Sequence, residues 1–387
     1  WEQRKLGEVG NTFTGLSGKT KEDFGHGEGK FITYVNVFNN PVADLDGLES
    51  VEIDNKQFQV KAGDVLFTTS SETPEEVGMS SMWLGNADNI YLNSFCFGYR
   101  PTIEFDNYYL AFMLRSASIR KKFQLLAQGI SRYNISKNKV MEMSIPVPSI
   151  EEQQKIGAFF KQLDDTIALY QRKLDLLKEQ KKGFLQKMFP KNGAKVPELR
   201  FKGFTDDWEG RKLGESSDVR DGTHASPKYV SQGHPMVTSK NLTHFGLDMT
   251  DVSFLTDKDF NEINKRSKVS IGDILFGMIG TIGNPVIVDR DDFAIKNVAL
   301  IKEKTSNPIT NKWLLQYLKS PSFNRFIQKE NAGGTQKFIS LGLIRDMKLR
   351  VPEFDEQQKI GAFFKQLDDT IALHQRKLDL LKEQKKG

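Results

Sequence analysis

The chain has 387 residues, 38% hydrophobic and 27% charged; this length supports two or three domains, and the composition excludes a membrane protein and a disordered tail. Its 55 Lys and Arg against 50 Asp and Glu leave a net charge of +5, which permits a nucleic-acid partner but does not by itself argue for one. The single cysteine, Cys96, excludes an internal disulfide framework and Cys-based zinc or iron–sulfur sites, and fits a reducing cytoplasm.

Two bodies of mixed α/β character are predicted, residues 1–150 (body one) and 208–354 (body two). In body one, β-branched and aromatic runs predict strands at 30–37, 57–60, 64–69 and 95–99, and a helix at 108–126. In body two the corresponding strands are expected at 236–239, 273–278, 285–288 and 298–301, and the helix at 311–330. Strands come first and one helix closes each body, which is the order of an α+β fold.

An internal repeat follows each body. Residues 151–183 and 355–387 are identical at 31 of 33 positions, at an offset of 204. Shorter repeats are WEQRKLGE (1–8) with WEGRKLGE (208–215), and GDVLF (63–67) with GDILF (272–276). Outside these repeats the two bodies are unrelated in sequence. The chain is therefore a tandem duplication, in which a variable body precedes each constant segment.

The constant segments are predicted to be long helices, at 151–188 and 355–387. Their apolar residues recur in steps of four and three, a mean of 3.5 that is typical of a left-handed coiled coil. Two near-identical helices pair most simply about a pseudo-twofold axis, so we expect an antiparallel coiled coil with the bodies at opposite ends. The alternative is that each helix packs as an ordinary core helix on its own body. The predicted seam consists of Ile156, Phe160, Leu163, Ile167, Tyr170, Leu174 and Leu177, and of Ile360, Phe364, Leu367, Ile371, His374, Leu378 and Leu381.

Residues 189–207 are rich in Pro, Gly and Lys, which predicts a linker. The first copy of the repeat continues past Gly183 as FLQKMFP, and the second WE-x-RKLGE is preceded by VPELRFKGFTDD. We therefore expect the native chain to carry a stretch resembling 196–207 before Trp1 and a few residues after Gly387.

Motifs for catalysis are missing from the sequence. It has no P-loop, no H-E-x-x-H zinc motif, no G-x-S-x-G elbow and no methyltransferase Asn/Asp-Pro-Pro-aromatic motif. The five histidines do not have metal-ligand spacing, so no metal site is predicted. His374 falls on the predicted seam, where we expect a packed polar side chain rather than a pH switch.

Polar, glycine-containing loops are the remaining candidates for function. They carry Arg and Lys, which recognise guanine and phosphate, and Asn and Gln, which recognise adenine. They also carry Ser and Thr, which can form hydrogen bonds with either base. Ordinary turn chemistry is the alternative for any single residue. The candidate DNA-contacting residues are Ser17, Lys19, Lys21, Ser70, Ser71, Arg132, Tyr133, Asn134, Lys137, Thr223, His224, Ser226, Lys240, Asn241, Thr281, Thr335, Gln336 and Lys337.

The whole chain resembles the DNA-specificity subunits of type I restriction–modification enzymes. The resemblance lies in PVPSIEEQQKI (146–156), VPEFDEQQKI (351–360), DGTH (221–224) and the two WE-x-RKLGE starts. Body one departs from the pattern, because it has TGLSGKTK (14–21) where body two has RDGTHASP (220–227). The resemblance implies two target-recognition domains, each reading one half of an asymmetric split site on double-stranded DNA, and helices that set the spacer.

The resemblance also implies partners. Adenine methylation and ATP-dependent cleavage would belong to modification and restriction subunits, so S-adenosylmethionine, ATP and Mg would be bound there and this chain would hold no cofactor and be non-catalytic. The duplicated helices predict two docked modification subunits, on faces that include Phe159, Asp165 and Lys173 and their copies Phe363, Asp369 and Lys377. There are two rival hypotheses: the chain is itself catalytic, or it is a coiled-coil adaptor that does not touch DNA. An activity assay of the chain alone tests the first, and titration with duplex DNA tests the second.

Overall fold

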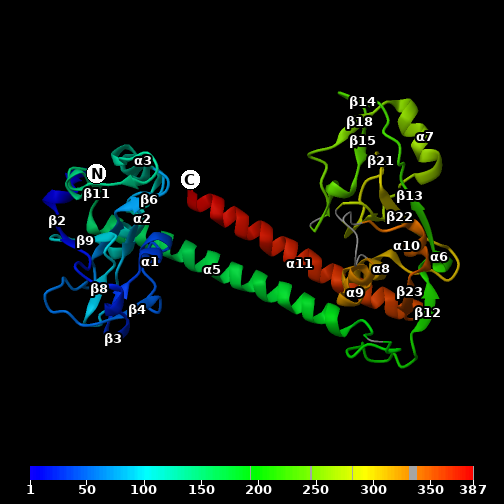
Figure 1. The fold of residues 1–387 in the computed structure, drawn as a ribbon, viewed down its shortest axis with the longest axis horizontal. Coiled ribbons are helices and arrows are strands. Elements are labelled where there is room, and N and C mark those ends of the chain that lie inside the picture. The colour runs from blue at the N-terminus through cyan, green and yellow to red at the C-terminus, as the bar shows by residue number, and fades with distance from the viewer. Residues whose placement is uncertain (192, 245, 281, 331–337, 387) are drawn as a thin grey trace. The chain divides into compact units, whose positions relative to one another are not determined.

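The computed structural model describes residues 1–191, 193–244, 246–280, 282–330 and 338–386 (Figure 1). The chain divides into two compact units. Unit one comprises residues 1–170 and 378–387, and unit two comprises residues 171–377. Each unit therefore contains one body together with part of each long helix.

Body one is built around a four-stranded antiparallel sheet in the order β2-β9-β5-β7. Its strands are β2 (Gly10–Thr14), β9 (Cys96–Pro101), β5 (Val65–Thr68) and β7 (Ser80–Met82). A second sheet has the order β4-β3-β8, with β3 parallel to β8. A two-stranded ribbon, β1 with β11, closes the body. Their bounds are β4 (Leu48–Val51), β3 (Phe24–Ile32), β8 (Ile90–Leu92), β1 (Glu2–Lys5) and β11 (Ser144–Val147).

Body two repeats this plan, although its sequence is unrelated outside the short repeats. Its central sheet has the order β13-β22-β19-β20, and its second sheet the order β14-β18-β15-β21, with β15 parallel to β21. A ribbon of β12 and β23 matches β1 and β11. The bounds are β13 (Ser217–Asp221), β22 (Val298–Glu303), β19 (Ile274–Gly277), β20 (Gly283–Ile287), β14 (Tyr229–Val230), β18 (Ser253–Leu255), β15 (His234–Val237), β21 (Ala294–Ile295), β12 (Glu209–Lys212) and β23 (Lys348–Val351).

The strands predicted at 64–69, 95–99, 273–278, 285–288 and 298–301 are confirmed, because these runs are buried in the central sheets. The prediction at 30–37 was wrong in its second half, where α1 (Tyr34–Asn39) begins behind the N-cap of Thr33. Residues 57–60 are not a strand. Residues 236–239 are a strand only as far as Val237.

Each predicted closing helix is two helices. In body one, α2 (Asn107–Leu114) ends at Arg115, and α3 (Ala117–Leu126) begins after an extended Ser116. In body two, α8 (Asn311–Lys319) ends before Ser320, and α9 (Pro321–Glu330) begins with proline at its first position. Proline favours that position because its missing N–H is not needed there. The same break occurs in body one without proline, so tertiary packing and not local sequence alone imposes it.

The two repeated segments form α5 (Ile150–Lys187) and α11 (Phe354–Lys386), within a residue of the predicted bounds. A buried glutamine ties each helix to its body. The Gln153 side chain accepts from the Asp106 N–H at 3.1 Å and donates to the Pro148 carbonyl at 3.0 Å. Gln357 does the same with Thr310 and Pro352, at 2.8 and 3.0 Å. A buried amide satisfied on both sides fixes the first turn of each helix.

An ion pair between the helices occurs twice. In unit two, Lys181 of α5 pairs with Asp368 of α11 at 2.5 Å, and in unit one Lys385 of α11 pairs with Asp164 of α5 at 2.5 Å. Asp368 and Lys385 are the copies of Asp164 and Lys181 at the offset of 204. The two pairs are therefore one contact made in both directions, which confirms the antiparallel, pseudo-twofold pairing.

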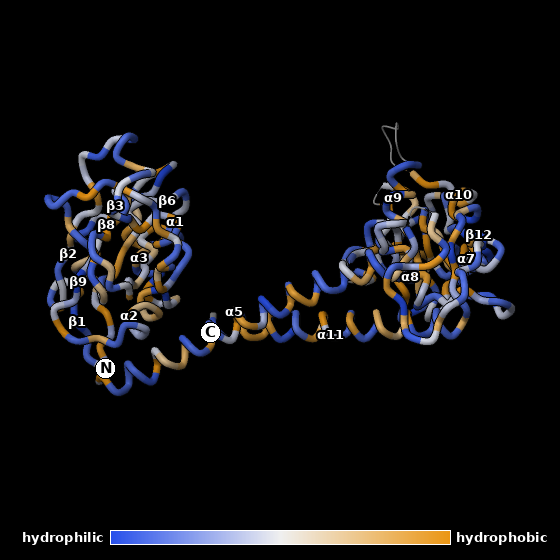
Figure 2. The backbone as a smooth tube through the Cα atoms, turned by 90° about the horizontal axis from the view of Figure 1, so that it is seen from below, coloured by the Kyte–Doolittle hydropathy of each residue, from blue (hydrophilic) through white to orange (hydrophobic). Residues whose placement is uncertain are grey.

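All fourteen residues of the predicted seam are buried or half-buried. At the start of each helix they pack on a body: Ile156 contacts the core of body one, and Ile360 and Phe364 belong to the core of body two. Leu174 and its copy Leu378 are each 1% exposed. The half-buried His374 donates from Nδ1 to the Thr370 carbonyl at 2.9 Å, so it is a satisfied polar residue of the seam. Figure 2 shows the same division, with hydrophobic stretches inside the bodies and recurring hydrophobic turns along two mainly hydrophilic helices.

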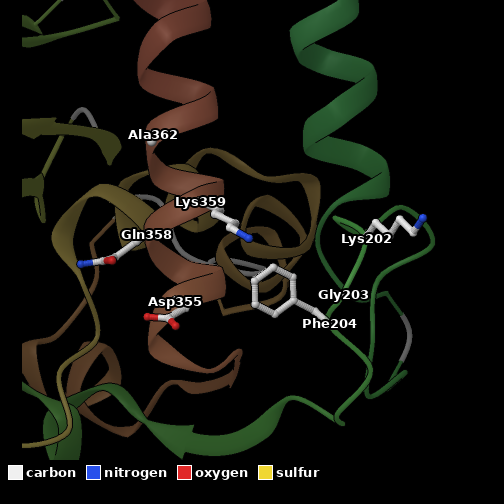
Figure 3. A pocket seen from close by; sticks show the side chains of 7 residues that line it. All are labelled: Lys202, Gly203, Phe204, Asp355, Gln358, Lys359 and Ala362. Atoms are coloured by element: carbon white, nitrogen blue, oxygen red, sulfur yellow. The ribbon is translucent and has the colours of Figure 1, made fainter.

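The segment predicted as a linker, residues 189–207, is part of unit two and packs on the rest of that unit. Phe189 is buried against Trp208, and the Arg200 guanidinium makes two hydrogen bonds of 2.7 and 2.8 Å to the buried carboxylate of Glu356. Phe204 lies under the ammonium of Lys359, 4.7 Å from its ring centroid (Figure 3). The aromatic and arginine residues of segment 189–207 anchor it by these contacts, although its Pro, Gly and Lys content predicted a linker. Within the described ranges, none of the helices has the length and apolar character needed to span a bilayer.

Candidate nucleic-acid interface

The predicted loops of body one meet at one end of its central sheet. Thr14, the last residue of β2, pairs with Phe97, and Thr68, the last of β5, pairs with Cys96 at the start of β9. The loops that follow β2 and β5 and the loop that precedes β9 therefore share one edge. In body two, Asp221 pairs with Ala299 and Gly277 with Val298, so the equivalent edge is formed by the ends of β13 and β19 and the start of β22.

A glycine directs the chain across this edge in both bodies. A Cβ atom on Gly15 would lie 2.1 Å from the Asn93 carbonyl oxygen, and one on Gly222 would lie 2.3 Å from the Ile295 carbonyl oxygen. The next residue in each case donates its N–H to the neighbouring strand, Leu16 to Leu92 at 2.8 Å and Thr223 to Ile295 at 3.0 Å. The loops TGLSGKTK and RDGTHASP are therefore structurally equivalent, and Ser17 of body one corresponds to His224 of body two.

A second predicted loop of body one joins the same edge. β10 (Tyr133–Asn134) pairs with β6 (Ser70–Ser71), so residues more than 60 positions apart in sequence lie side by side. Arg132 is exposed, and its guanidinium carbon lies 5.8 Å from the ring centroid of Phe95, which is itself 55% exposed. A cation held over an exposed aromatic ring offers both charge and a stacking surface to a nucleic acid.

The other candidates in body one differ in availability. Ser17 and Lys21 are exposed, whereas Lys19 is half-buried in ion pairs with Asp54 at 3.1 Å and Asp23 at 3.9 Å. The Asp54 hydrogen bond raises the pKa of Lys19 and holds it as a structural cation. Ser70 and Ser71 are buried, so they position β6 and do not face solvent. Lys137, half-buried, is the first residue of α4 (Lys137–Met141).

His224 is held between two oxygens at the edge of body two. Its Nε2 lies 2.9 Å from Asp221 Oδ2, and its Nδ1 lies 2.7 Å from Asn297 Oδ1. Both neighbouring atoms are acceptors, so this arrangement favours the doubly protonated form of the ring, in which both nitrogens donate. The hydrogen bond to Asp221 first, and that to Asn297 second, raise the pKa of His224 above its ordinary value. Arg266 of α7 (Asp257–Ser267) is a second cation on the Asp221 carboxylate.

The remaining described candidates in body two divide into exposed and structural residues. Ser226 is exposed and accepts a hydrogen bond from Lys296 at 2.9 Å, while Thr223 is half-buried and accepts from the Ala225 N–H. Lys240 is exposed and pairs with Asp251 at 2.8 Å. Asn241 is buried, and its amide donates to the carbonyls of residues 248 and 251, so it holds its own loop rather than facing a base. Thr281, Thr335, Gln336 and Lys337 lie outside the described residues.

A family model for the type I restriction modification DNA specificity domain matches residues 1–179 and again residues 205–383. The chain belongs to this family. It is a DNA specificity subunit, and its two bodies are recognition domains in tandem. The two matches begin near the paired tryptophans and end within the long helices, in agreement with the duplication.

Curated relatives extend over the same length. A putative type I restriction enzyme MjaX specificity subunit of Methanocaldococcus jannaschii is 23% identical over 403 aligned residues, covering 100% of this chain and 91% of the relative. The MjaVIII specificity subunit of the same organism is 23% identical over 354 residues, covering 88% and 81%. The alignment with the MjaX subunit thus spans both recognition domains and both helices.

Solved structures share the fold. The S subunit of the type I system from M. genitalium superposes with a TM-score of 0.61 at 17% identity, covering 100% of this chain and 94% of that one. The HsdS subunit from Thermoanaerobacter tengcongensis gives 0.52 at 18% identity, covering 100% and 94%.

Several residues of the specificity subunit's candidate interface are not among the sequence predictions: Phe95, Asp221, Arg266, Lys296 and Asn297. Lys296 and Asn297 interrupt two apolar strands as a polar pair, a signal visible in the sequence. Asn297 also has a φ of 56°, a left-handed conformation that asparagine tolerates better than most residues. Arg266 gives no sequence signal, because it is 45 positions from Asp221. The described residues bring together no group of three or more His, Cys, Asp and Glu side chains suited to a metal ion.

Proposed function

We propose that each recognition domain of this specificity subunit reads one half of an asymmetric bipartite DNA site. The carrying observation is that Gly15 and Gly222 bring equivalent loops to the same strand edge, while the side chains that these loops present differ. Body one offers Arg132 over Phe95, and body two offers His224 between Asp221 and Asn297. Two recognition domains that share one backbone fold but present different side chains should bind different half-sites.

The chemistry of each edge suits a division between bases and phosphates. Arg132 has the fork that recognises guanine, and the neighbouring Asn134 has the amide that recognises adenine. His224 and Lys296 present positive charge beside the glycine turn, where phosphate oxygens are best bound. Lys21, exposed on the short 3₁₀ turn Lys21–Asp23, is the corresponding phosphate partner in body one.

The two long helices set the spacer between half-sites in this proposal. α5 is one uninterrupted helix of 38 residues, which at ~1.5 Å per residue measures about 57 Å. A continuous helix joined to a second one along an apolar seam is stiff, whereas a linker would allow many spacers. The packing of residues 189–207 against unit two supports the helices as the ruler, because that segment has little freedom of its own.

The outer faces of the helices are the proposed docking surfaces for two modification subunits. Leu169 and Leu176 of α5 lie seven residues apart on one face and are 64% and 60% exposed. Their copies Leu373 and Leu380 are 65% and 62% exposed. An apolar stripe that the seam does not use, present in both copies, supports one modification subunit on each helix.

The faces expected around Phe159 and Phe363 are not equivalent. Phe159 is 62% exposed, whereas Phe363 is half-buried under Phe184 and Phe201, with ring centroids 5.0 and 5.9 Å away. The repeated leucines therefore carry the docking proposal better than the phenylalanines do. Asp165 and Lys173, with their copies Asp369 and Lys377, are exposed and complete these faces.

Catalysis belongs to the partners in this proposal. The modification subunits methylate adenine with S-adenosylmethionine, and the restriction subunits use ATP and Mg for cleavage, while this chain selects the sequence and holds no cofactor. Family membership supports this division. A methylation assay of the chain alone and of the chain with its modification subunits tests it directly.

A domain exchange tests the reading of two half-sites. Replacing residues 9–150 by the first recognition domain of another specificity subunit should change one half of the methylated motif and leave the other half and the spacer intact. Methylome sequencing of cells carrying the exchange reads all three features at once. A change in both halves would contradict independent reading by the two domains.

An insertion tests the ruler. Four Leu- and Asp-containing residues placed between Lys173 and Lys178 lengthen α5 by ~6 Å. Base pairs are ~3.4 Å apart. The partner helix stays unextended, so we expect the spacer to grow by one or two base pairs with both half-sites unchanged. An unchanged spacer would remove the helices from this role.

A further inference from the structure

A cavity of 560 Å³ in unit two lies outside the strand edge described above. Four parts of the chain line it: the segment that follows α5, helix α8 through Tyr317, helix α9 and strand β23. Its polar lining includes Arg325 and Lys329 of α9 and Lys348 and Arg350 of β23, together with Ser322. Four cationic side chains from two elements thus face one hollow.

This cavity has an excess of positive charge. No carboxylate is among its lining residues, and none of the four cations takes part in an ion pair within the described ranges. The cavity in Figure 3 differs, because Asp355 lines it together with Lys202 and Lys359. A neighbouring lysine outside the cavity, in contrast, is neutralised, because Lys212 pairs with Asp346 at 3.0 Å. Converging cations that the protein leaves unneutralised favour an anionic ligand.

The arrangement of the cations suits several negative charges in a row. Lys348 and Arg350 are two residues apart on β23, so they share one face about 6.6 Å apart, while Leu349 and Val351 are buried on the other face. Arg325 and Lys329 are four residues apart on α9, about 6 Å along its axis. Two rows of regularly spaced cations match a phosphodiester chain better than a single carboxylate.

Three of the four cations have no cationic counterpart in body one. At the offset of 204, the positions of Arg325, Lys329, Lys348 and Arg350 are Lys121, Leu125, Ser144 and Pro146. Lys122, at the position of Phe326, uses its ammonium on the Ser144 carbonyl at 2.6 Å. Two identical partner subunits would bind surfaces that both copies of the repeat provide. A surface present once fits a ligand that body two alone handles.

We propose that this cavity binds phosphates of the DNA backbone next to the half-site read by body two, and supplies affinity independent of base sequence. The proposal rests on the proposed function, since it takes DNA as the ligand. The chain supports it, because Phe338, which follows α9 by eight residues, pairs with Ile279 just beyond the end of β19 at the strand edge.

The test removes the charges of α9 in the assembled methyltransferase complex. Arg325 and Lys329 are exposed, so R325Q/K329Q retains the fold; the matched control K202Q/K265Q removes two exposed lysine charges elsewhere in unit two. Fluorescence anisotropy measures binding to a duplex with the motif found by methylome sequencing and to a scrambled duplex of equal length, over a range of salt concentrations. We expect R325Q/K329Q to weaken both duplexes by the same factor, about tenfold or more, and to reduce the salt slope by about 2, since each phosphate contact contributes ~0.9.

Three outcomes would overturn the phosphate site. They are an affinity and slope equal to those of the control, a loss confined to the motif duplex, and weaker binding of modification subunits with unchanged DNA binding. The proposed function fails separately, if the wild-type complex does not prefer the motif duplex. R350Q, on the other element of the cavity, should reduce the slope by about 1 and so repeats the test independently of α9.

Discussion

The exposed leucines of the long helices should contribute to binding modification subunits and not to folding. Complete burial of a leucine side chain is worth about 1.5–3 kcal/mol, and Leu176 and Leu380 have 60% and 62% of their surface left to bury. Each should therefore supply roughly 1–2 kcal/mol on docking. Removing both leucines of one stripe, Leu169 and Leu176, should cost roughly 2–4 kcal/mol, which is a loss of about 30- to 700-fold in affinity at that helix.

The assay is native mass spectrometry and calorimetric titration with purified modification subunit. L169A/L176A should leave one tightly bound modification subunit per chain, and adding L373A/L380A should remove the second. The thermal midpoint of the isolated chain should change little, because these side chains are largely solvated.

The matched control is the same leucine-to-alanine substitution at a residue of the seam. Leu174 is 1% exposed, so L174A should destabilise the fold by about 2–5 kcal/mol. Its copy L378A, also at 1%, should behave alike. Unchanged stoichiometry in the quadruple variant, or a loss of stability as large as that of L174A, would refute the assignment of two faces to these helices.

The raised pKa of His224 predicts that wild type is more stable than H224Q at low pH. This difference in the free energy of unfolding should be fully present below the ordinary histidine pKa and should be lost as the pH rises through the folded-state pKa. Equal unfolding midpoints of the two proteins at about pH 5.5 would contradict it. G15A should destabilise unit one by about 1–3 kcal/mol because its Cβ meets the Asn93 carbonyl, whereas G183A, with open space in α5, should stabilise by about 0.5–1 kcal/mol; denaturant titration separates them. L174P should break α5 at a cost of about 3 kcal/mol or more and abolish tight binding to the split site, while half-site duplexes keep their order of preference; tight binding of the intact site would show that α5 need not be continuous.

The long helices could be predicted almost residue by residue. Their signal is local, since apolar residues at steps of four and three describe one face of a helix wherever it lies. The partner was also in the sequence, as a second copy at an offset of 204. The repeated ion pairs of Asp164 with Lys385 and of Lys181 with Asp368 follow from that symmetry. Central strands such as β5 and β19 were predictable for the same reason, because their buried runs are continuous.

The candidate interface depended on contacts between distant residues. Serine and asparagine in polar loops look alike in sequence, yet Ser70 and Asn241 are buried while Ser17 and Ser226 are exposed. A buried amide is used where neighbouring carbonyls need a donor, and only the folded chain supplies those carbonyls.

The sequence alone therefore determined the duplication, the coiled-coil seam and the class of ligand expected from its loops. Tertiary structure decided that Gly15 and Gly222 are equivalent, that residues 189–207 pack on unit two, and that His224 lies between Asp221 and Asn297. The physical reason is sequence separation. Helical periodicity depends on neighbouring residues, whereas the charge and exposure of a loop side chain depend on distant strands, as His224 depends on Asn297, 73 positions away.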